Sequence, residues 1–210
     1  MHVPDGFLSP AITLPAYAVA APIWVRAARK HFGRGAAEAL PVMGSLTALA
    51  FVVQSIMVPV PGGASTHLSG VALLAVLYGP LAAFVCETLV LLVQALFFGA
   101  GGLTVLGVNA LALGLLGPAA AWIAFRLVRG WGDGAAAFAA GYLSLQVSAL
   151  AVAMVLGLQH VLAPGYLPVP PAVTLAAMLV PSLTVAGVLE GLYTVFALSL
   201  LRKVDPRAIP

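Results

Sequence analysis

Four histidines, at positions 2, 31, 67 and 160, are the side chains of this sequence best suited to bind a metal ion. His2 can take part in a chelate, because the terminal amine of Met1, the amide nitrogen of His2 and the His2 imidazole can hold one ion in adjoining five- and six-membered rings. One more nitrogen, from His67, would complete a planar set of four. Planar nitrogen coordination selects Ni(II) or Cu(II), whereas Zn(II) prefers tetrahedral sites and Mg(II) and Ca(II) prefer oxygen.

The elements that must position these histidines are membrane helices. Of the 210 residues, 62% are hydrophobic and 7% are charged, and the mean hydropathy is +1.12, whereas a soluble domain has roughly 25% charged residues. Residues 6–25, 39–86, 88–125 and 134–189 contain no Asp, Glu, Lys or Arg, and about 20 apolar residues suffice to cross a bilayer as a helix. We therefore predict an all-α integral membrane protein in which residues 1–210 form one transmembrane metal-binding domain.

Charges, glycines and prolines divide the chain into about seven transmembrane helices, because a backbone in lipid must leave the hydrocarbon before it can turn. The predicted spans are 8–27, 39–58, 68–78, 80–98, 103–127, 135–158 and 172–201. The third span is short. It follows a Pro- and Gly-rich loop, 58–66, and only Gly79 and Pro80 separate it from the fourth, so we expect it to be tilted or partly re-entrant.

The nine basic residues predict the orientation, because cytoplasmic loops retain Lys and Arg. All of them lie at the end of the first, fifth or seventh span or directly after it: Arg26, Arg29, Lys30, Arg34, Arg126, Arg129, Arg202, Lys203 and Arg207. We therefore expect an N-terminus outside and a C-terminus in the cytoplasm. The first apolar segment is expected to be retained, since a signal peptide would carry its positive charge ahead of its apolar core.

This topology sorts the histidines into groups. His2 and His67 fall together on the outer side. His31 lies in the basic cytoplasmic loop, where we expect a solvated or headgroup-facing role, and His160 lies in an outer loop, either as an interfacial residue or as part of a metal entry route.

Several other classes of protein are excluded. The single cysteine, Cys86, allows no intrachain disulfide and no CxxC site, and the scattered basic residues cannot form a nucleic-acid surface. No phosphate-binding GxxxxGK[ST] loop, HExxH motif or GxSxG motif occurs. We therefore expect neither an ATPase nor a hydrolase, and no organic cofactor.

Three hypotheses remain: a metal-binding transporter subunit, a stand-alone cation channel or carrier, and an intramembrane metalloenzyme. The few polar residues at the membrane midplane and the lack of an evident base disfavour the last two.

Four segments carry a family resemblance: MHVPDGFLSP, VPVPGGASTHLSGVALLAVLYGP, LVLLVQALFFGAGGLTVLGVNAL and PSLTVAGVLEGLYT. In these the chain resembles the CbiM/NikM family, the substrate-binding membrane subunits of energy-coupling factor transporters for cobalt or nickel. The resemblance implies a metal held by the Met1 amine, the His2 amide and imidazole, and the His67 imidazole. It also implies two cytoplasmic ATPase subunits, a transmembrane coupling subunit and a small accessory membrane subunit as partners, in the cytoplasmic membrane of a prokaryote.

The motifs around the two histidines are more similar to the nickel branch, so Ni(II) is the expected substrate and Co(II) for cobalamin biosynthesis the alternative. Cobalt members tend to carry a cysteine just before the loop histidine, where this chain has Ser65 and Thr66. Nickel members usually have Thr at the position of Ala64 and Gly directly before the histidine, at the position of Thr66. Because Gly can adopt dihedral angles that Thr cannot, Ser65 and Thr66 are expected to shape the loop. Asp5, in the matching N-terminal motif, is expected either to hold the N-terminal segment over the site or to orient a histidine.

Two glutamates lie within predicted spans, where charge is expensive. Glu87 and Glu190 are expected either to form part of a gate or a contact with the coupling subunit, or to pair with Asn109, Gln94, Gln146 or backbone groups. The sequence leaves both interpretations open.

Overall fold

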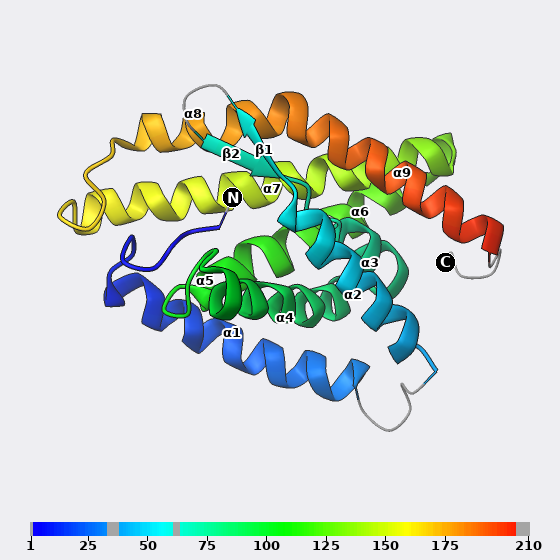
Figure 1. Cartoon of the computed structure of the whole chain (residues 1–210), viewed down its shortest axis with the longest axis horizontal. Helices are drawn as coiled ribbons and strands as arrows, with labels where there is room; N and C mark the ends of the chain where they lie inside the picture. Colours follow the sequence, from blue (N-terminus) through cyan, green and yellow to red (C-terminus); the bar gives the residue numbers. More distant parts are fainter. Residues whose placement is uncertain (1, 33–37, 61–63, 205–210) are drawn as a thin grey trace.

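A computed structural model describes residues 2–32, 38–60 and 64–204 of the chain (Figure 1). The described part is mainly helical, with one two-stranded ribbon. Its elements, in chain order, are α1 (Pro10–His31), α2 (Leu40–Ser55), β1 (Met57–Val60), β2 (Ala64–His67), α3 (Val71–Tyr78), α4 (Pro80–Phe98), α5 (Leu106–Asn109), η1 (Ala110–Leu116), α6 (Gly117–Val128), η2 (Arg129–Trp131), α7 (Asp133–Leu162), α8 (Pro171–Pro181), η3 (Ser182–Ala186) and α9 (Gly187–Val204).

Within the described residues, five helical stretches are long and apolar enough to cross a membrane: Pro10–His31, Pro80–Phe98, Leu106–Trp131, Asp133–Leu162 and Pro171–Val204. Large apolar side chains cover their outer surfaces, as at Phe97, Leu127 and Val161, which are 76%, 78% and 73% exposed. A soluble protein rarely exposes so much contiguous apolar surface. The chain is therefore a multi-pass membrane protein, while the count of seven spans and the sidedness of the termini stay predictions.

The third predicted span, 68–78, is a short helix buried in the core. Helix α3 has eight residues, so it rises about 12 Å, much less than the ~30 Å of the hydrocarbon layer. All residues from Val71 to Val76 are buried, and α3 contacts α2, α4, α6, α7 and α9. It is apolar on every side because protein surrounds it.

The loop before α3 contains the two strands, which corrects the all-α prediction. Strands β1 and β2 pair antiparallel with Met57 opposite His67 and Val60 opposite Ala64. Helix α2 ends at Ser55 rather than at residue 58, because a residue that precedes proline is disfavoured in the helical region, and Pro59 and Pro61 follow closely. Since His67 is opposite Met57, it lies at the base of the ribbon, next to the helices.

Two π-helical segments interrupt the long helices, and α7 supports both. In η3, the Gln146 amide donates to the Ser182 carbonyl at 2.6 Å and the Tyr142 hydroxyl donates to the Leu183 carbonyl at 3.0 Å. In η1, the Ser148 hydroxyl donates to the Ala112 carbonyl at 3.2 Å. Neighbouring side chains thus satisfy carbonyls that an irregular helix turn would leave unpaired in an apolar interior.

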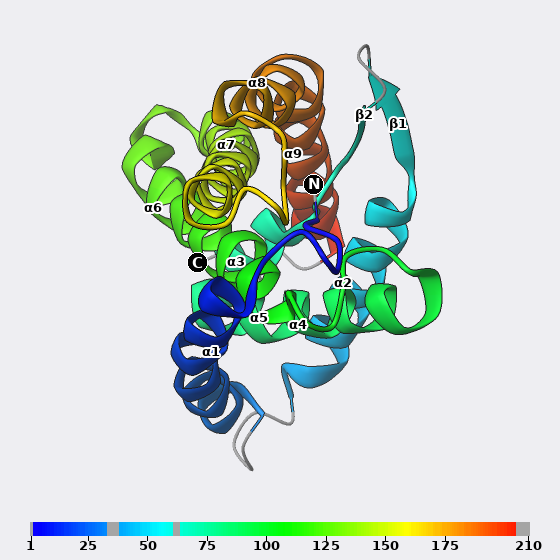
Figure 2. The same cartoon turned by 90° about the vertical axis from the view of Figure 1, so that its left-hand side faces the viewer.

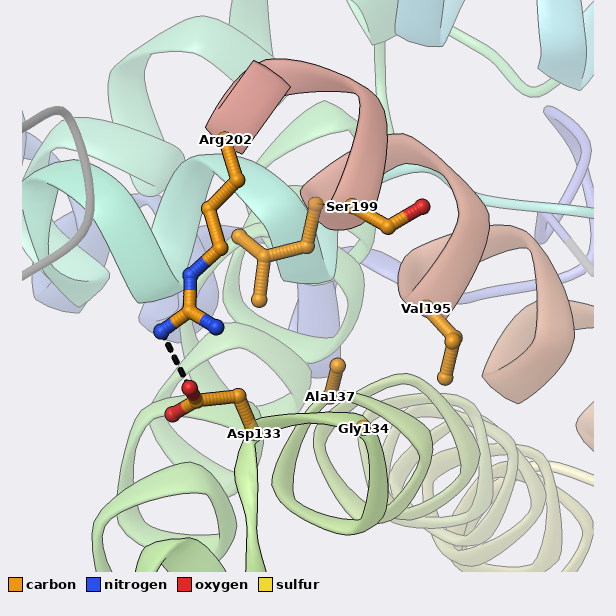
Figure 3. Close-up of a pocket in the computed structure, with 7 residues that line it drawn as sticks. Asp133, Gly134, Ala137, Val195, Ser199 and Arg202 are labelled. Carbon is orange, nitrogen blue, oxygen red and sulfur yellow. Dashed lines mark ion pairs between the residues drawn. The ribbon is translucent and has the colours of Figure 1, made fainter. Parts of the chain in front are cut away.

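The basic residues of the described part gather at one end of the molecule. Figure 1 places the ends of α1, α6 and α9 together on its right-hand side, and these ends carry basic residues in their last turns. There Asp133, at the start of α7, pairs with Arg202 of α9 (Figure 3) and lies 3.7 Å from Arg129. This ion-pair cluster, beside a cavity of about 90 Å³, ties η2, α7 and α9 together.

Candidate metal site

The two histidines predicted as ligands meet in the structure. Their rings stack with centroids 4.8 Å apart and planes inclined by 23°, although 65 positions separate them in the sequence. Figure 2 shows the N-terminal segment passing beside the base of β2. Met1 lies outside the described residues. Its terminal amine and the peptide bond that joins it to His2 both belong to the predicted chelate.

His67 is positioned by its own loop. Its ring is 4% exposed, and its Nδ1–H donates to the Leu68 carbonyl at 3.0 Å, which leaves the lone pair on Nε2. Burial lowers the pKa of His67 to about 3. The ring is therefore neutral at pH 7, which is the form that ligates a metal.

His2 is neutral for the same main reason. Burial lowers its pKa well below 6.5, the positive charge of the terminal amine adds to the effect, and the adjacent Gln54 amide opposes it. Its Nε2 is buried without a partner at hydrogen-bond distance among the described residues. A six-membered chelate ring with the His2 amide uses Nδ1, so Nε2 is the nitrogen left to carry the proton, next to Gln54.

Asn109 holds the backbone that follows His2. Its Oδ1 accepts from the Val3 N–H and its Nδ2 donates to the Val3 carbonyl, both at 3.0 Å. Asn109 is 1% exposed and Val3 also 1%. This pair of buried hydrogen bonds joins α5 to the N-terminal segment and fixes how His2 approaches the site.

Asp5 fastens the same segment further along. Its carboxylate accepts from the backbone N–H groups of Leu103 and Thr104, at 3.1 and 2.9 Å, and from the Thr104 hydroxyl. Gly102 makes room for this contact, since a Cβ atom there would lie 2.1 Å from the carboxylate. Two roles were expected of Asp5. These contacts correspond to the first of them, which is to hold the N-terminal segment in place.

Glu190 fixes the loop on the His67 side. Its carboxylate accepts from the Ser69 N–H at 2.7 Å, from the Ser69 hydroxyl at 2.8 Å and from the Gly70 N–H at 2.9 Å. These donors lie at the start of α3, where unpaired N–H groups and the helix dipole favour an anion. Glu190, on α9, is therefore paired with backbone groups, which is one of the two interpretations that the sequence left open.

Glu87 has a partner that the sequence did not suggest. Its two carboxylate oxygens accept from Nε2 of Gln54, at 2.8 and 3.1 Å, and Gln54 is 1% exposed. The available signal was a lone glutamine in an apolar span, which is costly unless it is paired. Asn109 and Gln146, named as possible partners of the glutamates, bond instead to Val3 and Ser182.

The other predicted residues lie as follows. Ser65 and Thr66 are on β2, opposite Pro59 and Val58, and their side chains are outside the described part. His31 and His160 lie at the ends of helices and not in loops as predicted. His31 is the last residue of α1, and His160 is in the last turn of α7, where its Nδ1 is 3.1 Å from the Leu167 carbonyl.

Fold and site together define a class: a multi-pass membrane protein in which a neutral histidine of the N-terminal segment stacks on a neutral, buried histidine of a short ribbon. The chain belongs to the CbiM family, because the family model described as "Cobalt uptake substrate-specific transmembrane region" matches residues 2–208.

Relatives and solved structures agree with this assignment. The chain is 37% identical, over 98% of its length, to a probable fused nickel transport protein LarMN of Lactiplantibacillus plantarum, and 34% identical, over its whole length, to a fused nickel transport protein NikMN of Rhodobacter capsulatus. It spans 66% and 64% of those two proteins. A crystal structure of a truncated transition metal transporter superposes with a TM-score of 0.90 at 34% identity, covering 97% of this chain and 99% of that one.

Proposed function

We propose that this chain is the substrate-binding membrane subunit of an energy-coupling factor transporter, and that it captures Ni(II) on the outer face for ATP-driven uptake. The observation that carries the proposal is the pair of stacked, neutral imidazoles of His2 and His67, of which His67 is buried and His2 is half-buried with its Nε2 buried. Two neutral imidazoles suit a late first-row divalent ion. Membership of a family whose description names metal uptake supports transport as the activity.

The residues act as follows in this proposal. The terminal amine of Met1, the amide and Nδ1 of His2, and Nε2 of His67 donate to the ion. Asn109 and Asp5 hold the N-terminal arm, and Glu190 holds the loop that carries His67. Both arms are therefore preorganised, so little ordering entropy opposes binding. Release requires separating the arms, which ATPase subunits would drive through a transmembrane coupling subunit in a prokaryotic cytoplasmic membrane.

Ni(II) is the proposed ion for a chemical reason. Binding an amide nitrogen displaces a proton, and a planar nitrogen set favours Ni(II). Two nickel-named relatives support this choice. Co(II) is the second candidate, because the family description names cobalt uptake. Competition titration of the purified chain distinguishes the two: Ni(II) should displace bound Co(II) at equal concentration, and the reverse displacement would make cobalt the substrate.

The decisive experiment blocks the terminal amine. Nickel affinity is measured on the purified chain with its native N-terminus and on a version with a few residues added before Met1. A third version carries the same residues after Pro210 as a matched control. We expect only the N-terminal extension to weaken binding strongly, and equal affinity in all three would contradict the chelate.

Histidine variants test the rest of the ligand set. His67→Ala should weaken nickel binding strongly, because it removes a ligand, whereas His160→Ala should leave the affinity unchanged, because its Nδ1, in the last turn of α7, faces the Leu167 carbonyl of the segment that follows. The opposite pattern would move the site to the loop after α7.

A further inference from the structure

Three oxygens converge on one nitrogen directly inside the histidine pair. Nε2 of Gln54 lies 2.8 and 3.1 Å from the two carboxylate oxygens of Glu87 and 2.9 Å from the carbonyl oxygen of Ser69. An amide NH₂ group has only two protons for these three acceptors. The oxygens therefore surround a small centre of partial positive charge, in the way that oxygen ligands surround a cation.

Glu87 lacks the compensation that Glu190 has. Both side chains are buried, at 1% and 0% exposure, but Glu190 receives two backbone N–H groups and a hydroxyl at the start of α3. For Glu87, the neutral Gln54 amide is the donor, and the ion pairs found in the described residues involve Asp133 and not Glu87. A carboxylate buried without a cation costs several kcal/mol, and ionisable groups inside a membrane protein commonly mark ion pathways.

A further oxygen next to this cluster has no partner. Gln94 is 4% exposed, and its Oε1 makes no hydrogen bond within the described part of the chain. Its Nε2 donates to Oε1 of Gln54 at 3.3 Å, so the amide of Gln94 is turned toward the cluster. Glu87 and Gln94 are seven residues apart on α4 and therefore lie on the same face of the helix.

We propose that Glu87, Gln94 and the Ser69 carbonyl form an inner oxygen site that takes the divalent metal ion after it leaves the outer histidines, and that the Gln54 amide fills this site until then. The proposal rests on the proposed function. Oxygen donors hold a late first-row ion more weakly than nitrogen donors do. A site on a conduction route must bind strongly enough to receive the ion and weakly enough to release it.

The position of Gln54 connects the two sites. Its amide lies next to His2 and also contacts Glu87 and Ser69. Ser69 is in turn held by Glu190 in the loop that carries His67. A movement of this loop, or of the His2 ring, therefore shifts the amide that occupies the inner oxygen site.

The first test compares Glu87→Gln with Glu38→Gln, which makes the same change at an exposed glutamate between α1 and α2. Nickel affinity is measured on the purified chain, and nickel uptake on the complete transporter. We expect Glu87→Gln to leave the affinity within about twofold and to lower uptake at least about tenfold, the smallest effect typical of a perturbed metal site. Glu38→Gln should change neither quantity. Uptake at the wild-type level in Glu87→Gln would overturn the proposal.

Gln94→Glu supplies a second test, which is informative even if the Glu87→Gln variant does not fold. A second carboxylate at the inner oxygen site should retain a further nickel ion, so equilibrium dialysis should find one more ion per chain than in the wild type, together with slower uptake. Wild-type stoichiometry with wild-type uptake would overturn the proposal. The proposal would also be overturned if Glu87→Gln lowered both the nickel affinity of the histidine site and the thermal stability, because Glu87 would then act only by positioning other residues. If the wild-type chain itself binds no nickel, the proposed function fails, which is a different result.

Discussion

The clamp between Asn109 and Val3 gives the sharpest prediction. Asn109→Ala removes two buried hydrogen bonds from the backbone next to His2. Each contributes about 1 kcal/mol, so the docked N-terminal arm loses about 2 kcal/mol. Only a docked arm can bind the ion, and the apparent Kd rises in inverse proportion to the docked fraction. The expected result is a nickel Kd raised by up to about 30-fold, at about 1.4 kcal/mol per decade.

The assay is calorimetric titration of the purified chain with nickel, and Gln146→Ala is the matched control. Gln146 also makes two buried hydrogen bonds, at 2.6 and 3.0 Å, but to Ser182 of η3. The two variants should lose similar thermal stability, whereas only Asn109→Ala should lose nickel affinity. An unchanged Kd in Asn109→Ala, or an equal loss in Gln146→Ala, would refute the idea that docking of the arm sets the affinity.

Three further predictions follow from the same contacts. Glu190→Gln should weaken nickel binding and preserve the helix content measured by circular dichroism, because an amide has one acceptor oxygen for the three donors of Ser69 and Gly70; unaltered binding would contradict this. Folding lowers the pKa of His67 to about 3, so the unfolded chain binds the imidazole proton of His67 more tightly than the folded chain does. The free energy of unfolding should therefore fall by up to about 1.4 kcal/mol per pH unit from this group as pH decreases from about 6.5. His67→Ala should flatten that dependence in thermal melts, and an unchanged slope would count against it. Arg202→Ala breaks a partly exposed ion pair with Asp133, so it should cost less than about 1 kcal/mol of stability and leave nickel affinity intact.

Most helices could be predicted from hydropathy and from glycine and proline. The predicted 80–98 coincides with α4, Pro80–Phe98, because Gly79 and Gly99, both at positive φ, bound an uninterrupted apolar run. The all-α prediction was wrong at residues 57–67, where two strands form a ribbon. Helix α3, Val71–Tyr78, forms most of the predicted span 68–78, but other helices bury it. An apolar run has the same hydropathy whether lipid or other helices surround it, so the burial of α3 was not readable from its sequence.

The proximity of His2 and His67 was also predictable, whereas the contacts that hold these two histidines were not. The chelating potential of His2 follows from covalent connectivity alone, and the one-sided placement of Lys and Arg put His2 and His67 on the same side. The hydrogen bonds that hold them join residues far apart in the chain, 106 positions for Val3 with Asn109 and 121 for Ser69 with Glu190. No local pattern specifies such pairs.

The sequence by itself therefore determined that this protein lies in a membrane and that its N-terminus can chelate a metal ion, because composition and covalent order are properties of the chain. Only the tertiary structure decided which buried polar groups satisfy one another. An interior polar atom must find a partner wherever the fold offers one, and here the partners come from α2, α4, α5 and α9. Their convergence near His2 places an arrangement of carboxylate, amide and carbonyl oxygens next to the candidate metal site.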